Sequence, residues 1–480
     1  MRQIGDLIRI SAFDPLMEED ILPLLHSFFP GADEDVEIRI TKDPDGSICV
    51  VTRMASRGDK EERITPGSKN DRREIRKDAA RAVYKQISAL AECELPWGML
   101  TGVRPTKLVL ERLEKGLAGH ASYLADRFCV TKEKAALAVR VAQKEYGLIK
   151  DLDYESGFSL YIGIPFCPSI CNYCTFGSHP LSRFGNLVGP YLEALEKEIV
   201  LTARLMTKRL DCIYIGGGTP SVLSPAQLDR LIGVMAENFD ISRAKEFCVE
   251  AGRPDTIDKE KLNVLRDRRV TRISVNPQSM VERTLKTIGR AHTPELIVEA
   301  FRIARDCGFD NINADLIAGL SGENPDDFRY TLSKMEELSP ESLTIHTLAH
   351  KRASRLTTSP EMFEGLEAIG VSQMVADGAI WAREHGMEPY YLYRQKNMTE
   401  NLENTGYSLP GKECLYNVLI MEEKQMILAL GAGASSKFVR DCSQRFERVE
   451  NVKSVKDYIE RIDEMTERKR LYIEENGIEV

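Results

Sequence analysis

Short apolar runs alternate with longer amphipathic stretches in the part of the chain that follows residue 160. We interpret the stretches between the runs as helices and the runs themselves as strands, at residues 160–164, 212–215, 247–249, 272–275, 312–317 and 343–345. Four of the helix starts carry an N-cap residue before a proline, at Ser224-Pro225, Thr293-Pro294, Asn324-Pro325 and Ser359-Pro360. Six such strand and helix units predict a parallel sheet, and strands joined by crossovers can curl into an open, partial barrel.

Polar residues and glycines fall where these strands end. In chain order they are Gly216, Gly217, Gly218 and Thr219 after the second strand, Glu250 after the third, Gln278 after the fourth with Arg290 at the end of the next segment, and Asp315 in the fifth; Ala349 follows the sixth. The carboxyl ends of parallel strands meet at one edge of a sheet, which is where α/β enzymes place their functional groups. We therefore expect these residues to converge.

The two flanking regions have less regular patterns. Residues 1–155 predict an α+β extension, with a hairpin formed by residues 36–40 and 48–52 around Asp43-Pro44-Asp45-Gly46 and helices at 72–92, 105–115 and 132–146. Beyond about residue 380 there are apolar runs at 390–393 and 428–435 and one charged helix at 455–470. The predicted division is 1–155, 156–380 and 381–480.

Composition narrows the class of protein. The chain has 480 residues, 42% of them hydrophobic, and no apolar run of membrane-spanning length. Its 11 cysteines are mostly scattered, and its first residues lack the pattern of a signal peptide, so we expect a cytoplasmic enzyme. The net charge of -9 argues against general nucleic-acid binding, although residues 57–85 form a mixed stretch rich in Lys and Arg.

The most specific chemical motif is Cys167-Pro-Ser-Ile-Cys171-Asn-Tyr-Cys174, directly after the first strand. Three closely spaced thiolates can bind three irons of a [4Fe-4S] cluster and leave the fourth iron open to a small molecule. The alternatives are a zinc site, for which His179 lies five residues on, and a disulfide, which leaves one thiol over. The spacing favours the cluster.

With this motif the chain resembles the radical S-adenosylmethionine (radical SAM) enzymes, and among them the oxygen-independent coproporphyrinogen III oxidase family. The resemblance covers roughly residues 155–440 and rests on YIGIPFCPSICNYC, IYIGGGTPS, RISVNPQS, ADLIAGLSGE and LGAGASS. The phrases LTGVRPTK and PYYLYRQKN are similar to the HemZ-like branch of that family. The resemblance implies a partial (β/α)6 barrel between an α+β extension and a small carboxyl-terminal region that covers the active site.

The resemblance also implies the site. Cluster ligands are implied at Cys167, Cys171 and Cys174, with a catalytic and cofactor-contacting tyrosine at Tyr161 ahead of them. Contacts to SAM, present as one or two molecules, are implied at Tyr161, Tyr173, Gly217, Gly218, Thr219, Glu250, Gln278, Arg290, Asp315 and Ala349. Of these, Arg290 can pair with a carboxylate and Asp315 can accept from ribose hydroxyls.

The implied reaction is the conversion of coproporphyrinogen III propionates to vinyl groups, giving protoporphyrinogen IX for haem biosynthesis. Hydrogen is removed from the propionate β-carbon, and loss of CO2 and of a second electron completes the vinyl group. The implied partners are the tetrapyrrole and an electron donor such as flavodoxin or ferredoxin. The substrate carboxylates need basic groups, for which we name Lys351, Arg352, Arg394 and Lys396.

Two departures keep haem binding or trafficking open as an alternative. The well-characterised oxidases have a further cysteine two residues beyond the third cluster ligand, where this chain has Phe176, and the related haem chaperones have an aromatic residue there. Those chaperones also carry a late H-N-x-x-Y-W phrase, whereas the corresponding stretch at residues 415–420 reads LYNVLI. A third class, RNA modification, rests only on the basic stretch in the extension.

Overall fold

The computed structural model describes residues 7–29, 34–65, 71–102, 104–175, 177–349, 354, 358–359, 365, 368–395, 398–440 and 445–478. The chain forms two compact units: unit 1 comprises Met1–Gln143 and Tyr393–Glu403, and unit 2 comprises Lys144–Leu392 and Asn404–Val480. The division into 1–155, 156–380 and 381–480 stays a prediction.

Unit 2 is built on a sheet of eleven strands among the described residues, and six central strands are parallel and lie in chain order. They are β5 (Gly157–Ile164), β8 (Arg209–Gly217), β9 (Glu246–Gly252), β10 (Arg272–Val275), β11 (Ile312–Ala318) and β12 (Ser342–Thr347). Their side chains are almost all buried, as expected for parallel strands covered on both faces. All six predicted strands are confirmed, and with them the α/β fold.

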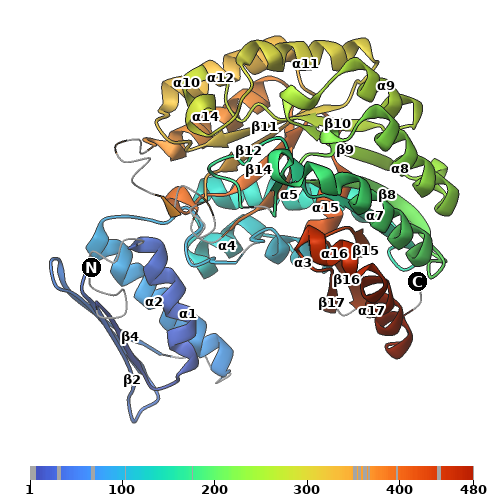
Figure 1. Ribbon diagram of the computed structural model, residues 1–480. Helices are drawn as coiled ribbons and strands as arrows, with labels where there is room; N and C mark the ends of the chain where they lie inside the picture. Colours follow the sequence, from blue (N-terminus) through green and yellow to red (C-terminus); the bar gives the residue numbers. More distant parts are fainter. Residues whose placement is uncertain are drawn as a thin grey trace. The chain divides into compact units, whose positions relative to one another are not determined.

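Helices follow these strands and lie along the outer side of the sheet (Figure 1). They are α7 (Val188–Ala203), α8 (Pro225–Asn238), α9 (Lys259–Asp267), α10 (Glu282–Thr287), α11 (Pro294–Asp306), α12 (Pro325–Leu338) and α14 (Val371–Glu384). Ser224 and Asn324 each form a capping box at the start of their helix, and Thr293 precedes α11 without a side-chain cap. Three of the four predicted helix starts are confirmed; Pro360 of the fourth lies outside the described residues.

Further strands extend the sheet at both sides. Next to β12 lie β14 (Asn404–Ser408), which is antiparallel to it, and then β13 (Glu388–Tyr393). On the other side β5 pairs in parallel with β15 (Met426–Leu430), followed by β16 (Ser435–Arg440) and β17 (Arg445–Glu450). The late strands are therefore part of the same sheet as the partial barrel.

The remaining helices of this region are α15 (Leu415–Glu422), α16 (Val455–Glu460) and α17 (Ile462–Glu475). The prediction of one helix at 455–470 is wrong, because the backbone leaves the helical region at Arg461, where φ is -116° and ψ is 25°.

Unit 1 contains a four-stranded sheet in the order β1-β2-β3-β4, with the helices α1 and α2 packed against it. Its elements are β1 (Ile8–Ala12), α1 (Leu16–Phe28), β2 (Val36–Lys42), β3 (Ile48–Met54), β4 (Gly58–Ile64), α2 (Arg72–Ala91), α3 (Lys107–Glu114) and α4 (His120–Phe128). Helix α5 (Lys132–Ile149) leads from unit 1 into unit 2. The predicted hairpin of β2 and β3 and the helices α2, α3 and α5 are confirmed.

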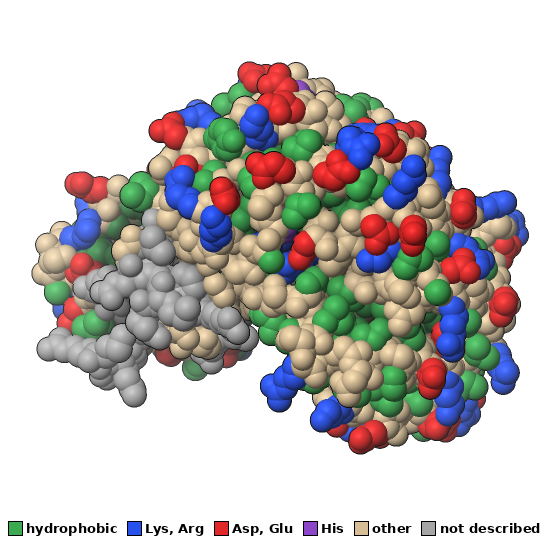
Figure 2. Space-filling model, turned by 45° about the horizontal axis from the view of Figure 1, so that its top comes forward, with side chains coloured by type: hydrophobic (Ala, Val, Ile, Leu, Met, Phe, Trp, Pro, Cys, Tyr) green, Lys and Arg blue, Asp and Glu red, His purple; other side chains and the backbone are tan. Residues whose placement is uncertain are grey.

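Charges of both signs are interspersed over the face of the molecule that Figure 2 shows. Among the described residues, no helix combines the length and the apolar character that crossing a membrane requires.

Candidate active site at the carboxyl ends of the strands

The three-cysteine motif lies on a loop that is fastened at both ends. After β5 the chain forms β6 (Phe166–Cys167), which pairs with β7 (His179–Pro180) on the far side of the loop. Asn172 fastens the middle: its backbone N–H donates to the Ile288 carbonyl at 2.9 Å and its side-chain amide donates to the Thr287 carbonyl at 2.8 Å. The loop is thus tied to the segment that follows β10.

The thiols occupy an enclosed, polar environment. Cys167 and Cys171 are 7% and 8% exposed, and Cys174 is partly buried. The Thr219 hydroxyl lies 3.4 Å from the Cys167 sulfur, and an Nη of Arg253 lies 3.9 Å from the Cys171 sulfur. Among the described residues, no three His, Cys, Asp or Glu side chains are grouped closely enough to hold one metal ion. A cluster, in contrast, takes each thiolate on a different iron.

The glycine turn after β8 lies directly against the first thiol. A Cβ atom on Gly218 would lie 2.9 Å from the Cys167 sulfur and 2.6 Å from the Phe166 carbonyl oxygen. Gly217 has a φ of 114°, which favours glycine, and its Cβ would meet the backbone of Ile164 at 3.0 Å. Because these side chains are missing, the backbone of the turn can contact the cysteine loop. A ligand bound to a cluster on this loop would therefore lie beside backbone groups of the turn.

A pair of carboxylates lies on β9 and β11, on either side of β10. Glu250 on β9 accepts a hydrogen bond of 2.5 Å from the Tyr214 hydroxyl. Burial raises the pKa of Glu250 to about 7, with a further contribution from the negative charge of Asp315. Asp315 on β11 accepts from the Asn313 amide at 2.7 Å and lies 3.8 Å from His346. Burial opposes its ionisation, but these contacts prevail and lower its pKa.

Three polar side chains in the segment that follows β10 have unused hydrogen-bonding atoms. The Gln278 N–H donates to the Asp315 carbonyl, and Arg290 donates to the Asn276 carbonyl at 2.5 Å and to the Tyr173 hydroxyl at 3.1 Å. Within the described residues, Gln278 Oε1, Asn276 Oδ1 and Arg290 Nε have no hydrogen-bond partner. Buried polar atoms without partners are costly, so these atoms fit contacts to a bound polar ligand.

Three tyrosine rings stack on the inner side of this site. The ring centroid of Tyr214 lies 6.2 Å from that of Tyr161 and 4.6 Å from that of Tyr416 on α15. Ala349 follows β12, and the Leu348 N–H beside it donates to the carbonyl of Ala318, the last residue of β11. The structure therefore brings the predicted residues to the carboxyl ends of the strands of one sheet.

Sequence reasoning missed Arg253, Tyr214, Tyr416 and His346, which all contact predicted site residues. Arg253 follows the end of β9 directly, so the same argument from strand ends applied to it. Tyr416 comes from a helix far along the chain, and no local signal in the sequence relates it to Tyr161.

Of the four residues named for substrate carboxylates, only Arg394 lies among the described residues. Lys351, Arg352, Lys396 and Phe176 lie outside the described residues. Arg394 is 3% exposed, belongs to unit 1 and donates to the Leu100 carbonyl and to Asn401. Its guanidinium is thus used in packing within that unit.

The turn at residues 431–433, between β15 and β16, is held by a buried ion pair. Glu198 on α7 accepts from Lys469 at 2.7 Å and from the Gly431 N–H at 2.8 Å. It also accepts from Asn451 and Tyr458. These contacts connect α16 and α17 to the strand edge beside β5.

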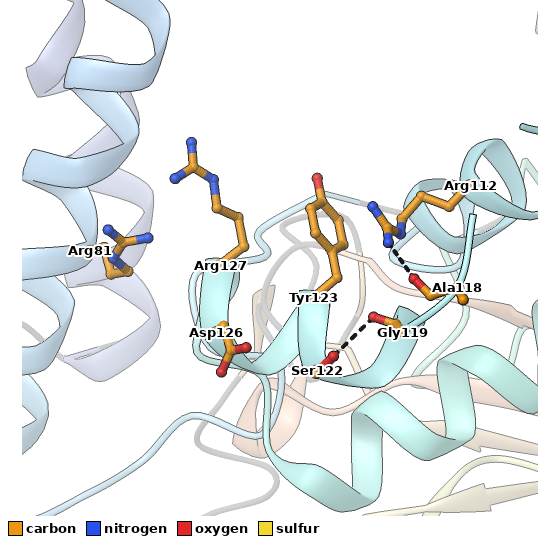
Figure 3. Close-up of a pocket in the computed structure, with 8 residues that line it drawn as sticks. All are labelled: Arg81, Arg112, Ala118, Gly119, Ser122, Tyr123, Asp126 and Arg127. Carbon is orange, nitrogen blue, oxygen red and sulfur yellow. Dashed lines mark hydrogen bonds between the residues drawn. The ribbon is translucent and has the colours of Figure 1, made fainter. Parts of the chain in front are cut away.

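A separate cavity of about 420 Å³ in unit 1 is lined by three arginines, Tyr123 and Ser122 (Figure 3). Arg81 and Arg127 both pair with Asp78, at 2.9 and 3.2 Å. Arg112 donates to the Ala118 carbonyl at 2.6 Å and lies over the Tyr123 ring. Each of the three arginines is thus held by groups of the protein itself, and the cavity does not point to a bound ligand.

Comparisons with known proteins agree with this geometry. The family described as the Radical SAM superfamily matches residues 161–335. A relative in Bacillus subtilis, named oxygen-independent coproporphyrinogen-III oxidase-like protein HemZ, is 43% identical over 387 residues, which are 79% of this chain and 77% of the relative. The heme chaperone HemW of Lactococcus lactis is 32% identical over 58% of this chain and 69% of its own. The solved structure of coproporphyrinogen III oxidase (HemN) from Escherichia coli matches with a TM-score of 0.54 at 24% identity, over 69% of this chain and 73% of its own, and supports the fold.

Proposed function

Because the chain belongs to the oxygen-independent coproporphyrinogen III oxidase family of radical SAM proteins, we propose that it catalyses the oxygen-independent oxidative decarboxylation of coproporphyrinogen III. The family uses a [4Fe-4S] cluster and SAM, which together supply hydrogen abstraction by a radical. Cys167, Cys171 and Cys174 hold the cluster in this proposal. The observation that carries it is the convergence of this loop, the glycine turn and the carboxylates Glu250 and Asp315 at one edge of the sheet.

The chain's own residues bind and orient the cofactor. Gly217 and Gly218 offer backbone groups beside the first thiol, where a side chain would clash. Asp315, whose pKa is lowered, would accept from the ribose hydroxyls of SAM, and Arg290 would pair with its carboxylate. The stacked rings of Tyr161, Tyr214 and Tyr416 form the inner wall and exclude water.

Haem binding or trafficking is the second candidate. It is supported by the relatives named heme chaperone HemW and by the aromatic Phe176 where the characterised oxidases have a cysteine. The stretch LYNVLI at residues 415–420 counts against it, because it lacks the histidine and the Tyr-Trp pair of the chaperones' H-N-x-x-Y-W phrase.

Anaerobic incubation of the reconstituted protein with coproporphyrinogen III, SAM and a reductant, followed by mass analysis of the tetrapyrrole, tests the proposal. We expect loss of two carboxyl groups as CO2 and formation of protoporphyrinogen IX. Haem retained without turnover supports the chaperone instead. Phe176→Cys is assayed in parallel: a vinyl product from this variant alone means that the natural protein is not an oxidase.

A further inference from the structure

Arg253 is a buried charged side chain that the proposed function has not yet used. It follows β9, is 3% exposed and forms a bidentate ion pair with Asp255, at 2.9 and 2.7 Å. The Asp255 side chain is only 18% exposed. A partly buried ion pair costs desolvation and is held in place by its further hydrogen bonds, so the directions in which those bonds point are informative.

The remaining hydrogen bonds of Arg253 are directed at the cysteine loop. One Nη lies 2.9 Å from the Ser169 hydroxyl, 3.3 Å from the Ser169 carbonyl oxygen and 3.9 Å from the Cys171 sulfur. The carboxylate of Asp255 fixes the plane of the guanidinium, because a fork of two parallel hydrogen bonds allows one orientation. The same N–H group therefore supports the loop and faces the central thiol of the motif.

We propose that Arg253, positioned by Asp255, sets the reduction potential of the cluster through its hydrogen bond and charge at the Cys171 sulfur. This inference rests on the proposed function. Hydrogen bonds to cluster sulfurs and the net charge around a cluster are among the properties that tune its potential. Reduction adds one negative charge to the cluster, and a nearby cation stabilises that reduced form. Arg253 thus makes the cluster easier to reduce, and Asp255 is the positioning residue that orients it.

Three variants test the inference with the reconstituted full-length protein. Iron and sulfide are counted first, and the midpoint potential is then measured by titration with dithionite and mediators, without SAM. Arg253→Gln removes the cation and leaves the Asp255 carboxylate uncompensated. We expect it to keep its iron and to hold about tenfold less reduced cluster at a given potential, which is a shift of about 59 mV to more negative values for one electron.

Asp255→Asn provides the opposite change. It removes the anion and leaves the guanidinium uncompensated beside Cys171, so we expect a shift to more positive potential.

Arg209→Gln is the matched control. Arg209 also pairs with the carboxylate two residues further along the chain, Asp211, at 2.9 and 3.2 Å. This pair lies at the start of β8, whereas the glycine turn lies at the end of that strand. We expect no shift in this variant.

The outcomes separate the two proposals. A wild-type protein that takes up no iron contradicts the proposed function itself. A wild-type cluster with unchanged potential in Arg253→Gln, or a shift of the same sign in Arg253→Gln and Asp255→Asn, overturns the inference. If Arg253→Gln does not retain its cluster, Asp255→Asn decides, and an unchanged potential in that variant overturns the inference.

Discussion

The Tyr214 hydroxyl donates a 2.5 Å hydrogen bond to the carboxylate of Glu250, from one parallel strand to the next. This bond favours the ionised carboxylate, whereas burial and the charge of Asp315 favour the neutral acid and prevail. The net effect raises the pKa of Glu250 from its ordinary value of 4.5 to about 7.

The first prediction concerns stability and pH. Because the pKa of Glu250 is higher in the folded chain than in the unfolded one, the folded state holds the proton more tightly. Stability is therefore lost as the pH rises from about 4.5 to about 7. Glu250→Gln, which keeps the acceptor for Tyr214, should have the same melting temperature as wild type at pH 4.5 and a higher one at pH 8.

The measurement is the melting temperature of both proteins at several pH values. Glu260→Gln, an exposed position on α9, is the control for removing one acidic side chain. A difference between Glu250→Gln and wild type that does not grow with pH contradicts the prediction.

The second prediction concerns SAM. Asp315→Ala should weaken SAM binding by about 1–3 kcal/mol, the usual cost of losing a charge-assisted hydrogen bond, while the iron content stays unchanged. Asp310→Ala, just before β11, removes an exposed carboxylate and should bind SAM as wild type does. Equilibrium dialysis measures the affinities, and equal values for the two variants place Asp315 outside the SAM site.

The third prediction concerns the cluster ligands. Cys171→Ala should lose the brown chromophore and SAM cleavage, because a cluster held by three thiolates has no replacement for a missing one. Cys93→Ala removes an exposed cysteine of unit 1 and should retain both. Iron and sulfide analysis after identical anaerobic reconstitution measures the result; full cluster content in Cys171→Ala refutes the assignment.

The fourth prediction concerns the buried pair of Lys469 and Glu198. Lys469→Met leaves the Glu198 carboxylate buried without its cation and should cost about 3–5 kcal/mol of unfolding free energy. Lys197→Met breaks the pair of Lys197 with Asp463, which joins the same two helices at the surface, and should cost at most about 1 kcal/mol. Denaturant unfolding compares the two variants, and equal costs show that burial of the pair is unimportant.

Much of the fold could be predicted because the pattern of parallel strands is local. Each of the six central parallel strands is a short, mostly apolar run, and Ser224 and Asn324 mark helix starts by their own side chains. The pairing of β15 with β5 could not be predicted, since a five-residue apolar run does not specify its partner. Strand β4 could not be predicted for the opposite reason. Its sequence is charged and almost none of its side chains is buried, so only its pairing with β3 makes it a strand.

In the site, too, the local features could be predicted from the sequence and the contacts between distant segments could not. Strand ends indicated Glu250 and Asp315, and the cysteine spacing indicated the cluster. The contacts of Arg253 with Cys171 and of Tyr416 with Tyr161 depend on how distant segments pack, and no period or spacing in the sequence encodes them.

The parallel pairing of β5 with β15 also orders events during synthesis. Strand β5 leads directly into the cysteine loop, and one of its edges acquires its partner only when residues 426–430 have been made. Until then the nascent chain on the ribosome exposes an unpaired apolar strand beside three free thiols, a state prone to aggregation and oxidation. The edge of the sheet beside the three thiols is therefore completed only after residues 426–430 have been made.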